Sequence, residues 1–259
     1  MRSKLLCWAV AFAAGSCFPS ARAVQSVDFS LVSVGVSDRV QKVPYDLNDA
    51  ELPSRLSGTE FGRAVLLTPE YFAGSMGCIS QLLSFRVDGG SAERLVSIRF
   101  SDPGRSESTN VTALGTRKIK TEQSMTMNAL VTDRAGVVLF SRNFEQTLVR
   151  EFAPAERPVG ECNPCDKLVR KCLSDLAMAL KEEFTVRIRI SVRLPEGCDE
   201  FNAETVAVRI DGTAVDHTAD IRIRKGDHIV DVTADGCVSV SQPIKAKENS
   251  LLSFKLKRK

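Results

Sequence analysis

The chain has 259 residues, of which 43% are hydrophobic and 26% are charged, as in an ordinary globular protein. Its formal net charge is only +3, which gives no indication of a dedicated polyanion binder, so no nucleic-acid partner is expected. After residue 23 no apolar run approaches the roughly 20 residues that a membrane-spanning helix needs. We therefore expect the remainder to be soluble, or soluble with a lipid tether.

Residues 1–23 have the pattern of a bacterial export signal. A positive start (residues 1–4) precedes an apolar stretch (5–14) that is too short to span a bilayer, and residues 19–23 end in a small-residue cleavage site at Ala23. This pattern predicts an extracytoplasmic protein, periplasmic or secreted, in an oxidising compartment. Residues 1–23 are thus interpreted as the signal peptide.

A second cleavage site competes with Ala23. Residues 14–17 read Ala-Gly-Ser-Cys, a loose lipobox in which Ala stands where Leu is usual. Cleavage before Cys17 would attach lipid to that residue and anchor the protein on a membrane. A membrane partner is therefore expected only if Cys17 is lipidated.

Strand patterns dominate the first half of the chain. Residues 26–36 alternate with one irregularity at residues 32–33, and residues 79–87 and 95–100 also read as strands. A short helix is expected within residues 61–72 and a loop at 105–115. Residues 118–131 and 137–151 alternate around a turn at 133–136, which predicts a long hairpin, and the apolar run 137–140 is core-sized.

The best helix signal covers residues 163–184. Asn163 suits the N-cap, Pro164 suits the first helical position, and an apolar stripe that contains Cys172 repeats at helical spacing. This face is expected to lie on the chain's own sheet. At Thr185 the period changes to two with no flexible linker, so we predict an α+β domain at 24–184, an antiparallel sheet packed by this amphipathic helix, and a second domain at 185–259.

The last third shows short strands separated by Asp-Gly and Lys-Gly turns, which is typical of a small antiparallel sandwich. Residues 206–212, which end in Ile-Asp-Gly, and residues 225–232, Lys-Gly-Asp-His-Ile-Val-Asp-Val, resemble the PEGA domain, a small surface-associated β module. Residues 235–237, Asp-Gly-Cys, stand where that family usually has Gly-Tyr. The resemblance implies an extracytoplasmic accessory module over about residues 186–259 and no catalytic residues.

The sequence contains eight cysteines, of which Cys7 and Cys17 precede residue 23. An even number of the rest in an exported protein predicts disulfides. We pair Cys198 with Cys237, since both lie in the last third, and Cys172 with Cys78, which precedes an apolar strand. The remaining two are Cys162 and Cys165.

Residues 162–165, Cys-Asn-Pro-Cys, allow two interpretations. The motif resembles the thioredoxin active site, and a thiol at a helix N-terminus has a lowered pKa, which would make this chain a thiol–disulfide oxidoreductase. A loop precedes the motif instead of a core strand, however, and no aromatic residue precedes Cys162. The other interpretation is a structural disulfide at the helix start.

No other catalytic or metal-binding constellation is present in the sequence. His217 and His228 are expected in surface or turn positions, and the arginines and lysines of the last third are expected on solvated strand faces. We predict no cofactor and no metal. The main hypothesis is a non-enzymatic envelope protein that binds or scaffolds an envelope protein or cell-surface component; the alternatives are the oxidoreductase and a lipid-tethered assembly factor of an outer-membrane complex.

Overall fold

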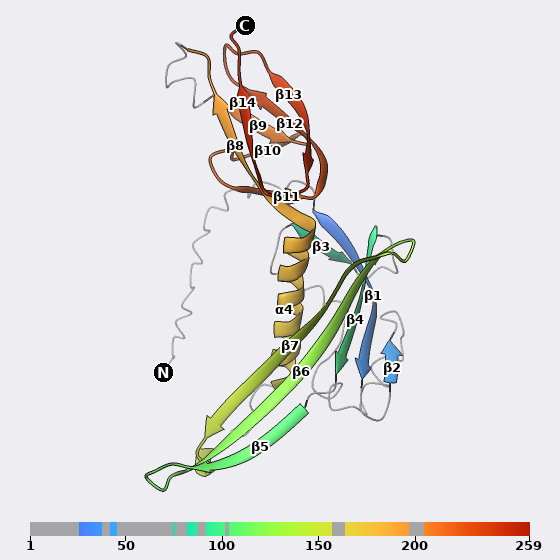
Figure 1. Ribbon diagram of the computed structural model, residues 1–259, viewed down its shortest axis with the longest axis vertical. Coiled ribbons are helices and arrows are strands. Elements are labelled where there is room, and N and C mark those ends of the chain that lie inside the picture. Colours follow the sequence, from blue (N-terminus) through green and yellow to red (C-terminus); the bar gives the residue numbers. More distant parts are fainter. Residues whose placement is uncertain are drawn as a thin grey trace, which may run out of the picture.

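The computed structural model describes residues 26–37, 42–45, 75, 82–86, 92–101, 104–156, 164–196 and 205–259. These residues form mostly β-structure, in several sheets, with one long helix, α4 (Figure 1). The strands of the N-terminal part, residues 26–184, are β1 (Val27–Ser37), β2 (Lys42–Tyr45), β3 (Leu83–Arg86), β4 (Arg94–Ser101), β5 (Gly104–Val111), β6 (Arg117–Asp133) and β7 (Val138–Phe152). A 3-10 turn, η1 (Pro154–Glu156), precedes α4 (Pro164–Phe184).

The N-terminal sheet has seven strands and is mixed, with the order β2-β1-β4-β6-β5, while β3 pairs with β1 and β7 with β6. The strand β1 runs parallel to both β3 and β4, so the predicted antiparallel sheet is wrong at these two pairings, while the other pairings of the sheet are antiparallel. Side chains alternate with a period of two in both kinds of sheet, so alternation does not reveal strand direction. The irregularity expected in β1 is confirmed as a register shift between Leu31 and Ser33.

The expected long hairpin is confirmed as β6 and β7, which pair antiparallel along almost their whole length. The expected loop at 105–115 is wrong for residues 105–111, because β5 pairs with residues 117–124 of β6, whereas residues 112–115 do form a turn. Residues 105–111 of this strand are all exposed on both faces, so it carries no apolar alternation. Backbone pairing with β6 forms the strand without an apolar signal.

The helix α4 confirms the prediction for residues 163–184 and packs against β6 and β7. Its apolar stripe, Cys172 included, is fully buried among Phe29, Phe100 and Met127 of the sheet. An i,i+4 ion pair joins Asp166 to Arg170 on the solvent side of the first turns. The stripe therefore serves the chain's own core, as its amphipathic spacing predicts.

The C-terminal part, residues 185–259, forms two sheets around a second hydrophobic cluster. One sheet has the order β10-β9-β12-β13 and is antiparallel. In the other, β11-β8-β14, the strands β8 and β14 are parallel, which corrects the expected all-antiparallel sandwich. The strands of the two C-terminal sheets together are β8 (Thr185–Arg193), β9 (Ala207–Ile210), β10 (Thr213–Val215), β11 (Ile221–Arg224), β12 (Gly226–Thr233), β13 (Val240–Ala246) and β14 (Ser250–Lys255).

The two parts meet where α4 ends and β8 begins, with no residue between them (Figure 1). The backbone N–H of Lys225 donates to the carbonyl of Phe184 at 2.9 Å. Arg222 of β11 donates through Nη1 to the carbonyl of Lys181 at 3.2 Å and to the Thr185 hydroxyl at 2.9 Å. The last carbonyls of the helix are thus satisfied by groups from the C-terminal part.

Candidate functional site

The turn between β6 and β7 is fixed by one carboxylate. Oδ1 of Asp133 accepts hydrogen bonds from the N–H groups of Ala135 at 2.9 Å and Val137 at 2.8 Å. Gly136 takes a φ of 83°, in the left-handed region that favours glycine. These hydrogen bonds and the glycine conformation define the turn from which β7 begins.

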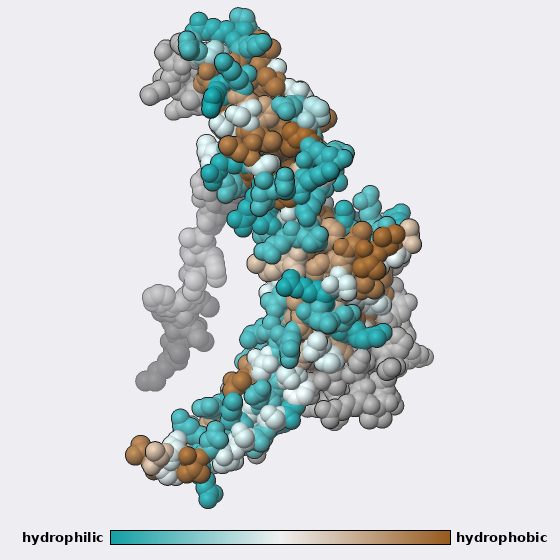
Figure 2. All heavy atoms as spheres, in the orientation of Figure 1, coloured by the Kyte–Doolittle hydropathy of each residue, from teal (hydrophilic) through white to brown (hydrophobic). Residues whose placement is uncertain are grey.

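This turn exposes three consecutive apolar residues. Val137 and Val138 are each 57% exposed, and Leu139 is also exposed. Figure 2 shows the hydrophobic surface over this turn at the right of the view. The run 137–140 has the length of a core segment, but within it only Phe140 packs against the core. The sequence signal that could have revealed this is a run of apolar residues directly after a glycine turn, where strand alternation has not yet begun.

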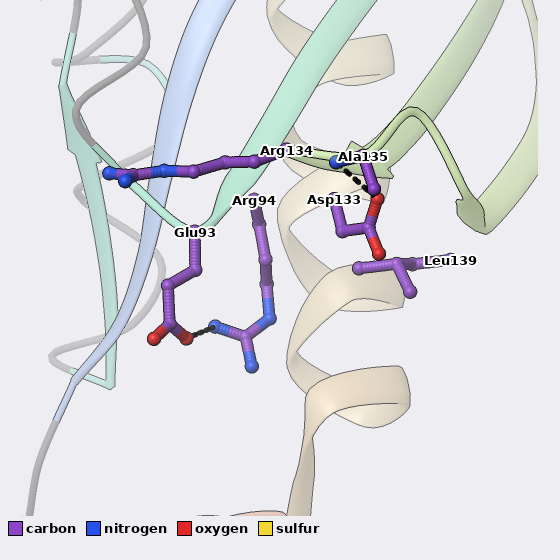
Figure 3. Close-up of a pocket in the computed structure, with 6 residues that line it drawn as sticks. All are labelled: Glu93, Arg94, Asp133, Arg134, Ala135 and Leu139. Atoms are coloured by element: carbon purple, nitrogen blue, oxygen red, sulfur yellow. Dashed lines mark hydrogen bonds and ion pairs between the residues drawn. The ribbon is translucent and has the colours of Figure 1, made fainter.

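A cavity of about 510 Å³ adjoins the turn (Figure 3). It lies between the start of β4 and the β6–β7 turn, and Leu139 lines it beside the charged groups. Nε of Arg134 donates to the carbonyl of Ala92 at 3.2 Å, which ties the turn to the segment before β4. The residues that line the cavity are Glu93, Arg94, Asp133, Arg134, Ala135 and Leu139.

Arg94 connects this cavity to the end of α4. Its guanidinium lies over the ring of Phe184, 5.3 Å from the ring centroid, and Nη1 is 3.7 Å from Oε2 of the exposed Glu93. Nε of Arg94 is buried and has no hydrogen-bond partner among the described residues. Phe184 in turn packs edge-on against Phe29. Aromatic packing thus holds this guanidinium at the rim of the core.

The arrangement combines two guanidinium groups with an exposed apolar turn. Guanidinium groups match carboxylate and phosphate oxygens, and exposed apolar residues in a row favour contact with another apolar surface. The carboxylates of Glu93 and Asp133 line the same cavity, so charged groups of both signs lie beside the apolar turn. The site can therefore contact a partner that presents an apolar surface with polar groups around it. Within the described ranges, no cluster of His, Cys, Asp and Glu has the arrangement of a metal site.

Several predicted site residues lie outside the described residues. These are Cys17, Ala23, Cys78, Cys162 and Cys198, together with the short helix expected within 61–72. The pairs Cys198–Cys237 and Cys78–Cys172, the Cys162–Cys165 motif and the two cleavage sites therefore stay predictions.

Three of the predicted cysteines are described, and all three are buried. Cys165 lies in the first turn of α4. The backbone of Cys237 forms an isolated antiparallel β-bridge with that of Arg258. Cys172 lies at the centre of the helix stripe, where burial, with a smaller effect of the Asp175 carboxylate, raises the pKa of its thiol to about 12. A thiol in this environment is a poor nucleophile near neutral pH.

The histidines separate into two environments. His217 lies in a turn, as expected. The expectation of a surface or turn position is wrong for His228, which is buried in β12. Its Nδ1 is 2.6 Å from Oδ2 of Asp211, and its Nε2 is 2.9 Å from the carbonyl oxygen of Arg224. The ring is buried because β12 alternates strictly, which places position 228 on the same face as the core residues Val230 and Val232.

Arg222 also departs from its expected solvated position. It is half-buried at the junction, where it caps α4. Burial lowers the pKa of Arg222 from its ordinary value, nearby Arg187 lowers it further, and Glu182 opposes the shift. Alternation in β11 does not indicate this role, because the carbonyl that accepts from Arg222 belongs to Lys181, 41 positions earlier in the chain.

Comparison with known proteins leaves the family open. No protein-family model matches the chain, and no curated protein matches it. Among solved structures, a homolog of neuraminyllactose-binding hemagglutinin from Helicobacter pylori is 9% identical, with 62% of this chain and 86% of that chain covered and a TM-score of 0.34. A minor lipoprotein from Acinetobacter baumannii is 12% identical (60% and 87% covered, TM-score 0.25). Rare lipoprotein B from Shewanella oneidensis is 10% identical (60% and 91% covered, TM-score 0.28), and scores this low do not indicate a shared fold.

Proposed function

We propose that this chain is a non-enzymatic, exported protein of the bacterial envelope that binds or scaffolds another envelope component. The observation that carries the proposal is the hydrogen-bonded apolar turn at Val137, Val138 and Leu139, exposed beside the Arg94 and Arg134 cavity. Adjacent exposed apolar residues gain free energy when a partner covers them, so a contiguous apolar patch favours a contact site.

Two features of the sequence support the location. Residues 1–23 have the export pattern, and about residues 186–259 resemble a surface-associated β module. Among the described residues, no helix is both long and apolar enough to cross a membrane. In this proposal, α4 and its contacts with β11 hold the two parts together, so that the apolar turn keeps a fixed position relative to the C-terminal sheets.

Export is tested by expressing the full chain in a bacterial host, fractionating the cells and determining the N-terminus of the product. We expect a periplasmic or secreted product that starts at residue 24, or at a lipidated Cys17. A product that keeps residues 1–23 and stays in the cytoplasm would contradict the location. Palmitate labelling that is lost on Cys17→Ala would identify the tether.

Binding is tested by cross-linking the exported protein to its envelope partners and comparing two variants. Val138→Asp places a charge on the apolar turn and should abolish capture. Val149→Asp is the matched control, since Val149 is a similarly exposed valine of the same strand, eleven residues further along β7. Equal capture by both variants would show that the turn is not the binding surface.

A further inference from the structure

One end of the N-terminal sheet projects as a hairpin whose turn carries an exposed leucine. The strand β5 and residues 117–124 of β6 form this hairpin, which extends in Figure 1 beyond the lower end of α4. The strand β7 pairs with β6 only as far as Ile119, so residues 111–118 form a two-stranded tip. Its turn is well ordered by hydrogen bonds: Thr112 N donates to Thr116 O at 2.9 Å, and Gly115 N donates to Thr112 O at 2.8 Å. Leu114 is 93% exposed on this turn, and Val111 is 64% exposed beside it. Hydrophobic surface is visible at this end of the molecule, at the lower left of Figure 2.

The apolar tip is flanked by positive charge. Residues 108–121 contain Arg117, Lys118 and Lys120 but no aspartate or glutamate; the nearest acids lie further from the tip, at Glu107, Glu122 and Glu151, which is opposite Lys120 on β7. Lys120 is 3.7 Å from Glu122, whereas Arg117 and Lys118 are exposed and form no ion pair with a described carboxylate. The register pairs Arg117 with Val111 and Lys118 with Asn110, so the two cations lie on opposite faces of the hairpin behind the tip.

We propose that this tip inserts Leu114 and Val111 into the boundary between headgroups and acyl chains of an anionic bilayer. Arg117 and Lys118 then contact the lipid phosphates on either side of the hairpin. Apolar residues that enter the interface, with basic residues behind them, are the combination that binds peripheral proteins to anionic membranes. The inference rests on the proposed envelope location, which places the chain next to a bilayer.

The size of the tip favours lipid over a protein partner. A stable protein interface buries about 800 Å² on each side, built around large anchoring side chains. One leucine and one valine at the end of a narrow hairpin offer much less. A bilayer requires no matching surface, so two apolar side chains and two cations give a weak and reversible contact.

Tryptophan fluorescence tests the insertion directly. The only tryptophan of the chain is Trp8, so the full chain with Trp8→Phe and Leu114→Trp carries one reporter at the tip. The matched control is the full chain with Trp8→Phe and Val138→Trp, which reports from the other exposed apolar turn. Because emission is local, membrane binding through residues 1–23 does not shift either reporter.

We expect vesicles of phosphatidylglycerol and phosphatidylcholine to shift the emission of the Leu114→Trp chain to shorter wavelength and to protect it from iodide. Vesicles of pure phosphatidylcholine should not shift the emission of the Leu114→Trp chain. Neither kind of vesicle should shift the emission of the Val138→Trp control. Adding Arg117→Gln and Lys118→Gln should raise the lipid concentration at half-shift by about tenfold or more, and added salt should act in the same direction. Circular dichroism checks that each variant is folded.

No shift with anionic vesicles would overturn the proposal, as would an equal shift of both reporters. A tip that cross-links to an envelope protein but does not bind lipid vesicles would also overturn the proposal. A negative vesicle result would not change the expected partner capture by the Val137–Leu139 turn. A negative cross-linking result would likewise not change the expected vesicle binding. The two proposals are therefore tested separately.

Discussion

Nη1 of Arg222 lies 3.2 Å from the carbonyl oxygen of Lys181, so a side chain of β11 caps the last turn of α4. The same nitrogen donates to the hydroxyl of Thr185, which itself donates to the Lys181 carbonyl. A cation at a helix C-terminus is favourable because it meets the negative end of the helix dipole and the unpaired carbonyls. This contact couples the two parts of the chain.

Replacing Arg222 should weaken that coupling. We expect Arg222→Ala to lower the free energy of unfolding by about 1 kcal/mol, through the lost cation at the helix C-terminus and its two lost hydrogen bonds; the Lys181 carbonyl still accepts from the Thr185 hydroxyl. The matched control is Arg189→Ala, whose ion pair with Asp220 is exposed and should contribute less than about 1 kcal/mol. Urea unfolding followed by circular dichroism measures both, and equal losses would contradict the capping role.

The pair formed by the buried His228 and the partly exposed Asp211 should make stability depend on acid pH. Burial alone would raise the pKa of Asp211, but hydrogen bonds from the Ile229 N–H and the His228 ring, with the charges of His228 and Arg224, lower it below its usual range. The ionised carboxylate therefore stabilises the fold fully above its unfolded pKa of about 4, and this contribution is lost as pH falls through the lower folded pKa.

We expect Asp211→Asn to destabilise the protein by about 2–3 kcal/mol at pH 6, because the buried ring loses its carboxylate partner. Asn also tolerates the φ of 51° at this position, so the change isolates the charge. The difference from the wild type should shrink as the pH is lowered below about 4. A difference that stays constant over that range, measured by urea unfolding, would contradict the assignment.

The Cys172 thiol should be unreactive in the folded protein, because its pKa is raised to about 12 and it is buried. We expect no alkylation by iodoacetamide at about pH 8 without denaturant. In denaturant without reductant, labelling of Cys172 indicates a thiol, whereas protection until reduction supports the predicted bond to Cys78. Rapid labelling of the native protein would contradict its burial, and peptide mass spectrometry reads out each case.

The β6–β7 turn should depend on the Asp133 carboxylate. Asp133→Ala removes the acceptor for two backbone N–H groups and should cost about 1–2 kcal/mol and weaken partner capture by the Val137–Leu139 turn. Asp133→Asn keeps an acceptor oxygen at the same place, so its losses of stability and of partner capture should both be much smaller. Thermal unfolding and the cross-linking assay measure the two effects. Equal losses would indicate that charge, and not hydrogen bonding, holds the turn.

Much of the fold was predictable because it depends on local periodicity. The spacing of apolar residues indicates α4, the β6–β7 hairpin and the irregularity in β1, since each buries one face against the core. The exposed β5 has no such signal, and it forms only because β6 offers an unpaired backbone edge. Strand direction could not be predicted either, because side chains alternate with a period of two in both parallel and antiparallel strands.

The candidate sites were less predictable than the fold. Arg94 and Arg134 lie 40 positions apart, and only sheet pairing brings the start of β4 next to the β6–β7 turn. The exposed Leu114 lies in a segment whose sequence predicts a loop. His228 had a burial pattern in its strand, but its partner Asp211 comes from a separate turn.

The sequence alone predicted the export signal at residues 1–23 and determined the long amphipathic helix and the change of period at Thr185, because each is a property of neighbouring residues along the chain. Only the tertiary structure decided that Arg222 caps α4, that His228 is buried against Asp211 and that two apolar turns reach solvent. These depend on which strands become neighbours, and the free energy of that choice is shared by residues far apart in the sequence.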